Sequence, residues 1–369
     1  MRLVYLSPVP WVSFKQRPHR FVEWFHDRHG GDVLWIDPYP TRLPKFADLR
    51  RAISSVTSES SLSADVPHWM RVVRPRAFPI DPLPGSVLLN QWLWRNVLVP
   101  VEQFLTEPNG LIVIGKPSAL ALQVLFRNAG VQSFYDAMDD FPAFYEGLSR
   151  RAMERHERAV AAKVSKILVS STALAARFNT HKPKVSLALN AYAAETLPTK
   201  SLSPSRTGQP VLGYVGTIGF WFDWPLVMAL ANASPMLRVR LIGPVYSLPP
   251  SGLPKNIELL PACDHAAAMR AMQGFSVGLI PFKRIDLTAS VDPIKYYEYR
   301  ALGLPIISTC FGEMALRANL PGVVLANSHK DLASVLERAL AYKPDKNEIQ
   351  KFQNDNSWGA RFDACDIFA

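Results

Sequence analysis

Short apolar segments alternate with amphipathic segments along most of the chain. Leu3–Leu6 has the pattern of a buried strand, Phe21–Phe25 give one face of a helix, and Val33–Ile36 predict a second strand. Such strand–helix–strand units imply parallel sheets. The same pattern predicts further strands at 70–73, 111–114, 131–135, 167–170, 185–189, 210–215, 238–242, 257–260, 277–281, 305–309 and 323–326, and helices at 119–127, 148–164, 172–178, 225–231, 266–272, 331–341 and 347–355.

Residues 86–105 predict a helix that is broken near Pro100. It carries Trp92 and Trp94, and we expect both indole rings to pack inside the N-terminal half, because an aromatic stripe usually belongs to a core. Next to Arg95, the same rings would also suit a membrane interface.

A polar stretch at 197–209, with two prolines and no apolar periodicity, predicts the boundary between two domains. We therefore expect an N-terminal domain over 1–196, a C-terminal domain over 210–345 and a final helical segment over 346–369. A chain of 369 residues is long enough for two cores.

Composition narrows the partners and the compartment. The formal net charge of +10 favours anionic partners such as a nucleotide, a pyrophosphate, acidic lipid or nucleic acid. Only three cysteines occur, without metal-ligand spacing, which favours a reducing compartment and argues against structural zinc. The chain starts directly with a strand and has no apolar run of about 20 residues, so we expect neither a signal peptide nor a membrane span.

The segment 286–309 holds the main candidate site. Asp286–Asp292 is polar and predicts a loop, Pro293 suits the first turn of a helix, and Gly303 suits its end. Lys295 and Glu298 lie three residues apart, on one helix face close to the N-terminus. That terminus favours phosphate, and a glutamate accepts hydrogen bonds from sugar hydroxyls. The combination predicts a site for a nucleotide-diphosphate sugar; taken alone, such a Lys–Glu pair more often just solvates a helix surface.

A glycine-rich turn follows the strand at 210–215. Gly216 lacks a Cβ, so the backbone N–H groups of Gly216 and Thr217 can approach a diphosphate closely. We expect Asp223 to cap the following helix, with a sugar contact as the alternative.

These two segments resemble GT-B glycosyltransferases of bacterial polysaccharide biosynthesis, which carry a D/N-P-x-K-x-x-E-Y core and a similar G-Y-x-G-x-I-x-x-W-F-D stretch. The resemblance to family 4-like enzymes implies an α/β protein with the GT-B fold, two Rossmann-like domains facing a cleft, and a C-terminal helix that crosses back to the first domain. It implies a donor site made of Gly216, Thr217, Thr288, Asp292, Lys295 and Glu298. Related retaining enzymes have two glutamates eight positions apart, but Ser290 stands at the first position here, so the stereochemical outcome stays open.

An acidic cluster follows the strand at 131–135. Asp136, Asp139 and Asp140 crowd together, which raises carboxyl pKa values and suits one of them to act as general base; helix capping is the simpler alternative. Xanthan glucuronosyltransferase-like enzymes carry a similar Tyr-x-x-x-Asp element, matched by Tyr135 and Asp139. We therefore name Asp139 and Asp140 as catalytic candidates, Asp139 first.

Gln16, Arg17 and His19 open the first helix, after a strand whose carboxyl end faces the ligand crevice in such folds. GT-B enzymes carry a similar Q-R-P, so an acceptor-side role is one interpretation. A pairing of Arg17 with a neighbouring carboxylate is the other.

The sequence predicts a glycosyltransferase that moves a hexosyl or glycuronosyl group from a nucleotide-diphosphate sugar, UDP favoured, to a saccharide or polyprenyl-diphosphate-linked acceptor. Positive charge from Lys295 and the helix terminus would replace a metal, so we expect no metal and no cofactor. We expect a cytoplasmic protein without nucleic-acid partners, compatible with peripheral contact on the anionic inner membrane. The alternatives are a sugar-nucleotide epimerase of the same architecture and a non-enzymatic basic protein that binds RNA or membrane.

Overall fold

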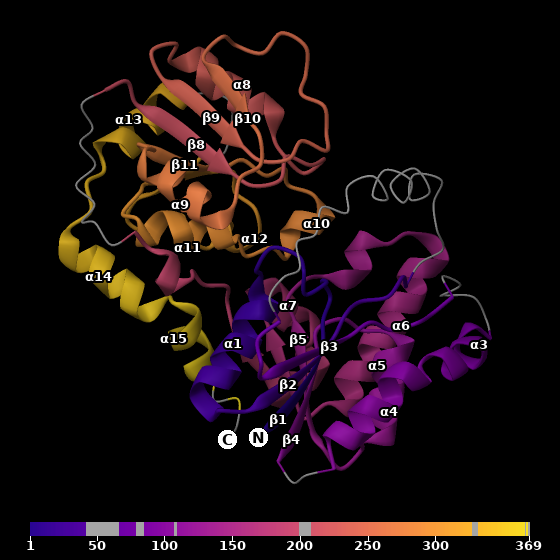
Figure 1. The fold of residues 1–369 in the computed structure, drawn as a ribbon. Helices are drawn as coiled ribbons and strands as arrows, with labels where there is room; N and C mark the ends of the chain where they lie inside the picture. The colour runs from indigo at the N-terminus through magenta and orange to yellow at the C-terminus, as the bar shows by residue number, and fades with distance from the viewer. Residues whose placement is uncertain are drawn as a thin grey trace. The chain divides into compact units, whose positions relative to one another are not determined.

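The computed structural model describes residues 1–41, 66–78, 85–106, 109–198, 208–326, 331–365 and 367. The chain forms two compact units (Figure 1). The N-terminal unit comprises Met1–Val169, Leu174–Leu187 and Ile367–Ala369, and the C-terminal unit comprises Ser170–Ala173 and Ala188–Asp366. The unit boundary at 187/188 precedes the linker predicted at 197–209, of which residues 199–207 lie outside the described part.

The N-terminal unit contains a parallel sheet with the strand order β3-β2-β1-β4-β5-β6-β7. Leu3 of β1, for example, is in register with Val33 of β2 and with Leu111 of β4. The chain moves outward from β1 to β3 on one side and then returns to β4 on the other, so the topological switch point lies between β1 and β4. The strands are β1 (Arg2–Leu6), β2 (Asp32–Ile36), β3 (Met70–Val73), β4 (Gly110–Ile114), β5 (Gln132–Ala137), β6 (Lys166–Val169) and β7 (Val185–Leu187).

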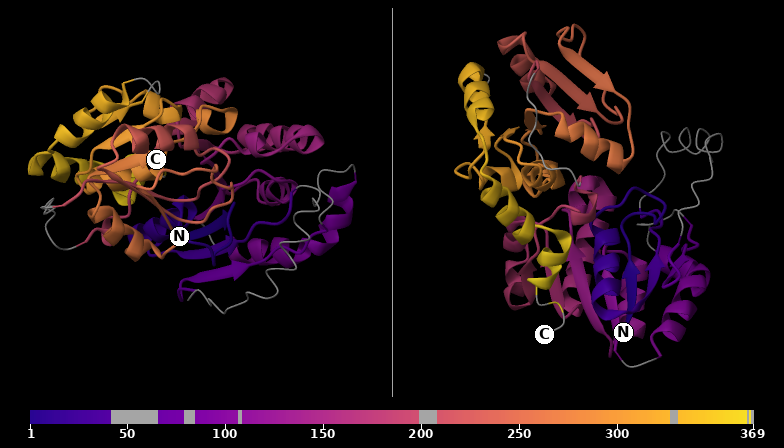
Figure 2. Two further views of the ribbon diagram at one scale, coloured as in Figure 1. Left: turned by 90° about the horizontal axis from the view of Figure 1, so that it is seen from above. Right: turned by 60° about the vertical axis from the view of Figure 1, so that its left-hand side comes forward.

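Helices flank this sheet (Figures 1 and 2). They bury apolar faces against strands that are themselves almost entirely apolar, as expected for a parallel sheet covered by helices. They are α1 (Arg17–His29), α3 (Ser86–Leu93), α4 (Arg95–Phe104), α5 (Ala119–Arg127), α6 (Gly147–Lys163) and α7 (Thr172–Arg177), with the 3₁₀ turns η1 (Phe141–Phe144) and η2 (Asn179–Lys184).

The C-terminal unit repeats this plan with the strand order β10-β9-β8-β11-β12-β13, and its switch point lies between β8 and β11. Its strands are β8 (Val211–Val215), β9 (Arg238–Ile242), β10 (Ile257–Leu260), β11 (Val277–Ile280), β12 (Ile306–Ser308) and β13 (Val323–Leu325). Its helices are η3 (Ala194–Thr196), α8 (Trp224–Ala233), α9 (His265–Gln273), α10 (Asp286–Ala289), α11 (Ile294–Ala301), α12 (Gly312–Ala315), α13 (Leu332–Ala341), α14 (Lys346–Asp355) and α15 (Trp358–Asp363).

Two local predictions were wrong. Residues 286–289 form the short helix α10 instead of a loop, because Thr288 caps the turn through the backbone N–H of Ile285. Residues 86–105 break at Trp94 and not at Pro100, which lies inside α4. Trp94 is fully buried as expected, whereas Trp92 is 69% exposed and belongs to the surface.

Within the described ranges, none of the helices is both long and apolar enough to cross a membrane.

Candidate active site

Helix α11 presents a buried carboxylate that contacts a lysine and a histidine. Glu298 is 4% exposed, and its two oxygens contact Lys295 Nζ at 2.5 Å and His265 Nε2 at 3.1 Å. Burial alone would raise the pKa of Glu298, but the charge of Lys295 and the hydrogen bonds from His265 and Lys295 outweigh it and lower the pKa to about 2. Glu298 is therefore a carboxylate, and only an acceptor, at neutral pH.

The same helix begins and ends as its sequence predicts. Pro293 is the N-cap residue and brings no side-chain cap, so the first N–H groups of α11 are left for a ligand. Gly303 has a φ of 68°, the left-handed conformation that ends a helix without a Cβ penalty. Lys295, in the first turn of α11, thus adds a full positive charge to a terminus that is already electropositive.

The glycine turn follows β8, at the carboxyl end of the strand next to β11. Gly216 has a φ of 154°, and a Cβ there would lie 2.8 Å from the Tyr214 hydroxyl. Its N–H donates to the carbonyl of Ile242 at 2.9 Å and is not available to a ligand. The N–H of Thr217 has no partner among the described residues. Of the two predicted amides, only that of Thr217 is therefore available to a phosphate.

The glycine turn and the segment before α11 lie on either side of the switch point between β8 and β11. In open parallel sheets, this is the place where ligands bind. The two loops also contact each other, since Lys283 donates its N–H to the carbonyl of Trp221 at 2.7 Å and its Nζ to the carbonyl of Phe220 at 2.9 Å. Topology thus brings Thr217 and Lys295 to one edge of the sheet.

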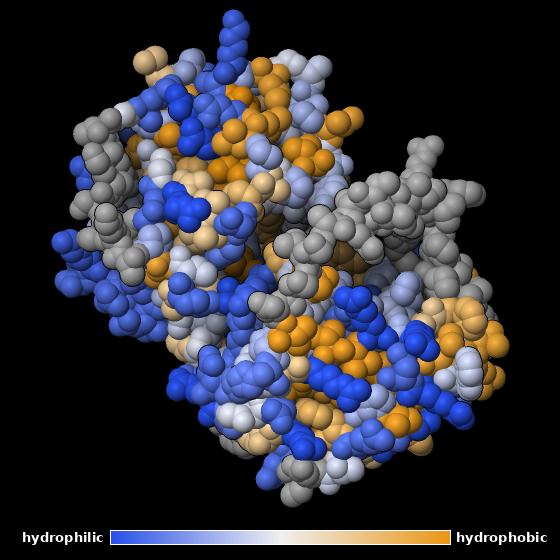
Figure 3. Space-filling view, viewed as in Figure 1, coloured by the Kyte–Doolittle hydropathy of each residue, from blue (hydrophilic) through white to orange (hydrophobic). Residues whose placement is uncertain are grey.

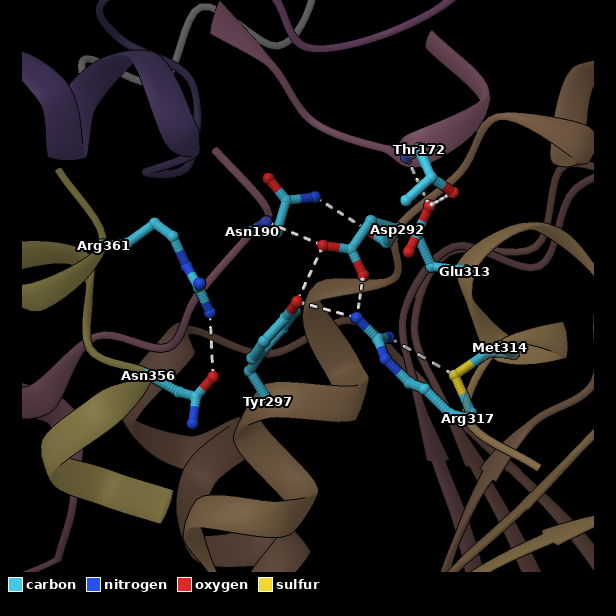
Figure 4. Close-up of polar contacts among 9 residues, drawn as sticks. All are labelled: Thr172, Asn190, Asp292, Tyr297, Glu313, Met314, Arg317, Asn356 and Arg361. Carbon is cyan, nitrogen blue, oxygen red and sulfur yellow. Dashed lines mark hydrogen bonds and ion pairs between the residues drawn. The ribbon is translucent and has the colours of Figure 1, made fainter. Parts of the chain in front are cut away.

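Asp292 is the centre of a buried network (Figure 4). Its carboxylate accepts hydrogen bonds from the Asn190 N–H at 2.7 Å, the Tyr297 hydroxyl at 2.9 Å and Arg317 Nη2 at 2.7 Å. The side chain has no exposed surface. These contacts let Asp292 fix the start of α11, and its predicted contact with the donor stays a prediction.

Thr288 is also occupied within its own loop. Its hydroxyl donates to the carbonyl of Lys283 at 2.5 Å, accepts from the N–H of Ile285, and is 2% exposed. Its predicted contact with the donor stays a prediction as well. Asp223 accepts from the Leu226 N–H at 3.0 Å, so it caps α8, as expected.

The acidic cluster of the N-terminal unit separates into three different carboxyls. Asp136 is fully buried and accepts from Arg17 at 2.8 Å and from the Tyr5 hydroxyl at 3.0 Å. Asp140 is ion-paired with Arg177. The Asp139 carboxyl has no partner among the described residues; burial, with smaller contributions from Asp136 and Asp140 and against the charge of Arg17, raises its pKa to about 7. Asp139 therefore stays the first candidate for a general base.

The predicted acceptor-side residues are mostly buried. Arg17 is 1% exposed and committed to Asp136, so the pairing interpretation is the right one. His19 is 1% exposed; its Nδ1 accepts from the N–H of Gln16 at 3.2 Å, its Nε2 lies 3.2 Å from the carbonyl of Trp11, and burial lowers its pKa. Gln16 is half-buried and caps α1. The contacts of these residues hold the connection between β1 and α1 in place.

Several functional residues escaped the sequence reasoning. His265 lies 33 positions from its partner Glu298, and Arg177 lies 37 positions from Asp140, so no local spacing connects them. A small pocket at the carboxyl ends of β1, β2 and β4, lined in part by Ser7, Asp37 and Lys116, was also missed. In the described part of the chain, no three His, Cys, Asp or Glu side chains gather in a metal-binding group.

Comparison of the fold with solved structures decides the architecture. Anabaena HepE in complex with UDP and glucose aligns over 100% of this chain and 96% of its own, with a TM-score of 0.60 and 13% identity. The chain has the GT-B fold. The lipopolysaccharide outer core galactosyltransferase WaaB gives a TM-score of 0.60 over 99% of each chain at 12% identity. An Escherichia coli trehalose-6-phosphate structure bound with UDP-2-fluoro glucose gives 0.60 over 100% of this chain and 96% of its own at 11%.

No protein-family model and no curated protein matches the sequence. The GT-B fold predicted from the sequence is thus confirmed by structural likeness alone. At these identities the likeness carries no assignment of individual residues, which rests on the geometry above.

Proposed function

We propose that the protein is a glycosyltransferase that uses a UDP-sugar as donor. The observation that carries this proposal is Glu298 of α11, a buried carboxylate held between Lys295 of the same helix and His265 of α9; helix α11 is the second helix after β11, a strand at the switch point. Solved GT-B structures of similar fold contain UDP, or UDP-2-fluoro glucose, which supports a uridine nucleotide over the alternatives.

The donor would bind by exchange of partners. Lys295 is 22% exposed and is the accessible half of its ion pair, because Glu298 is only 5% exposed. A diphosphate competes for the ammonium group, helped by the free N–H groups at the start of α11 and of Thr217. When Lys295 turns towards phosphate, Glu298 is released to accept hydrogen bonds from ribose hydroxyls. This positive charge would stabilise the departing UDP without a metal ion or other cofactor.

Asp139 would be the general base for an acceptor hydroxyl. A base works best when its pKa lies near the working pH, and burial has moved this carboxyl to about 7. Asp140 is the weaker candidate, because its carboxylate is neutralised by Arg177. In either stereochemical course the acceptor proton must pass to a base, and in a retaining transfer the departing diphosphate can itself be that base, so the assignment of Asp139 leaves the stereochemistry open.

The acceptor would be a saccharide or lipid-linked saccharide of bacterial surface or exopolysaccharide synthesis, as the name of WaaB suggests by analogy.

We place the protein in the cytoplasm, with peripheral contact at the inner membrane. Helix α3 exposes Leu88, Leu89 and Trp92 at 74%, 62% and 69%, next to the exposed Arg95, and Figure 3 shows hydrophobic surface at this end of the unit. Sedimentation with anionic vesicles should weaken for Leu88→Ser/Trp92→Ser and not for Leu316→Ser in the other unit; equal sedimentation of both variants would remove this contact.

The deciding experiment measures thermal stabilisation by UDP, GDP, ADP and dTDP at fixed ionic strength. A ligand of the folded state raises the melting temperature according to its concentration over its dissociation constant. We expect UDP to give the largest shift, and Lys295→Ala to remove it. Lys346→Ala, a lysine in the first turn of α14, is the matched control and should keep the shift.

Each result has a clear meaning. If no nucleotide stabilises the protein, or if Lys346→Ala loses the shift as completely as Lys295→Ala, the donor site is wrong. Turnover of UDP-sugar into a different sugar nucleotide without acceptor would identify an epimerase instead. Binding of RNA that UDP does not affect would favour the non-enzymatic alternative.

A further inference from the structure

A cavity of about 420 Å³ lies in the N-terminal unit, and all of its lining residues belong to that unit. Helix α6 forms one wall, and the end of α7 with η2 forms the other. Its base is apolar, since Pro142, Ala161 and Phe178 are buried residues that line it. The volume falls within the roughly 300–1,000 Å³ typical of small-molecule sites.

Three arginines and a histidine stand on the rim of this cavity, together with Glu154 and Glu157. Arg150 and Arg158 come from one face of α6, Arg177 comes from α7, and His181 comes from η2. Arg150 makes a long 3.3 Å contact with Glu154; the Arg150 side chain is exposed and Glu154 is half-buried. Arg158 donates through Nε to the backbone carbonyl of Glu154, also at 3.3 Å. Neither α6 guanidinium is buried in a tight ion pair, so both can turn to a ligand.

Two glutamates line the cavity, Glu154 and Glu157, and the second of them is buried. Glu157 is 2% exposed, accepts from the Tyr135 hydroxyl at 3.0 Å and contacts Arg177 at 2.5 Å. Burial, opposed by Arg177 and by the hydrogen bond from Tyr135, raises the pKa of Glu157 to about 7. Three arginines against Glu154 and Glu157 leave the lining with an excess of one positive charge.

We infer that this cavity binds a small phosphorylated sugar. The guanidinium groups of Arg150 and Arg158 would hold the phosphate, since planar guanidiniums bind oxyanions through paired N–H donors. The apolar base at Phe178 and Pro142 would take a face of the sugar ring. The proposal stands on the N-terminal unit alone and does not depend on the donor site.

A phosphorylated sugar bound in this cavity would also affect the acidic cluster, because Arg177 contacts Asp140. Arg177 lines the cavity and holds both Glu157 and Asp140, so a phosphate that draws on Arg177 weakens its hold on these two carboxylates. The site therefore suits either a phosphorylated acceptor or an effector, and the two are separated by whether the bound sugar is consumed when UDP-sugar is added.

Titration calorimetry at constant ionic strength tests the inference with inorganic phosphate, glucose 6-phosphate and glucose. We expect glucose 6-phosphate to bind more tightly than phosphate and glucose not to bind. Arg150→Gln/Arg158→Gln should weaken glucose 6-phosphate at least ten-fold. The matched control is Arg151→Gln/Arg155→Gln, which removes the same charge from exposed positions of the same helix and should change affinity less than two-fold.

The inference is overturned if glucose 6-phosphate shows no saturable binding to the wild type, or if both double variants lose affinity equally. UDP affinity, measured on the same variants, tests the donor site separately from this cavity. It should be unchanged in both double variants, so a protein that binds UDP but not glucose 6-phosphate keeps its donor site and loses this one.

Discussion

Glu298 in the C-terminal unit is buried and Asp139 in the N-terminal unit is half-buried, and the pKa values of these two carboxyls move in opposite directions. For both, burial is the largest influence and raises the pKa. Lys295 and His265 contact Glu298 directly and bring its pKa down to about 2, whereas Asp139 has only the more distant charge of Arg17 and stays at about 7. Direct cationic contact, and not depth of burial, therefore decides whether a carboxyl serves as a fixed charge or as a proton acceptor.

The largest expected effect comes from Asp139→Asn, which removes the proton acceptor and nearly preserves shape. General bases contribute about 10²–10⁴-fold to rate, so kcat should fall by that amount. In the wild type, kcat/KM should rise with pH and level off above about 7, because only the ionised Asp139 accepts a proton. Transfer rates with UDP-sugar across pH 5–9 measure both. Asp140→Asn serves as the comparison; a deeper loss there would exchange the roles of the two aspartates.

Next in size is Arg17→Gln, which leaves Asp136 buried without its cation. Breaking a buried ion pair by removal of one partner costs about 3–5 kcal/mol. Urea unfolding should show this loss, while Arg127→Gln, which removes an exposed pair with Glu102, should cost less than about 1 kcal/mol. Similar losses of stability for both variants would mean that the buried Arg17–Asp136 pair contributes no more than the exposed pair.

A smaller effect is expected for Glu298→Gln. The amide keeps the shape but releases Lys295 and removes the charged acceptor for ribose hydroxyls. Charge-assisted hydrogen bonds contribute about 1.5–3 kcal/mol, so UDP affinity should drop roughly ten- to hundred-fold. Calorimetry measures this, with Glu348→Gln on α14 as a control of equal charge change. Tighter UDP binding by Glu298→Gln would show that its role is to withhold Lys295.

The smallest effect concerns stability against pH. The pKa of Asp139 is raised on folding, so the unfolded chain binds fewer protons between about pH 4 and 7, and this carboxyl lowers stability as pH rises through that window. Asp139→Asn should therefore be more stable than wild type at pH 8 and equal to it at pH 4; because the side chain is half-buried, the gain stays below the roughly 4 kcal/mol that the full pKa shift corresponds to. A variant less stable at pH 8 would contradict the raised pKa.

The sequence was informative where the chemistry is local. Apolar runs located the strands, and the three-residue spacing of Lys295 and Glu298 placed them together because helix geometry dictates it. It was uninformative where partners are chosen by strand order. Arg17 meets Asp136 across 119 positions, and the burial that gives Asp139 its high pKa exists only in the folded unit. Trp92 shows the same limit, since composition predicts a core residue and packing leaves it exposed.

The hydrogen bonds of Asn190 bear on how this protein should be divided for study. Asn190 donates its N–H to Asp292 and its side-chain amide to the Asp292 carbonyl at 2.6 Å, and Tyr192 hydrogen-bonds with Asn356 and Trp358. A fragment cloned from Pro210 onward, as the polar linker invites, would lack both residues. In that fragment Asp292 would keep its hydrogen bonds with Tyr297 and Arg317 but lose those with Asn190. A fragment that begins at Ala188 is 22 residues longer and retains these bonds. We therefore expect the start of α11 to keep its structure in the longer fragment and to lose it in the shorter one.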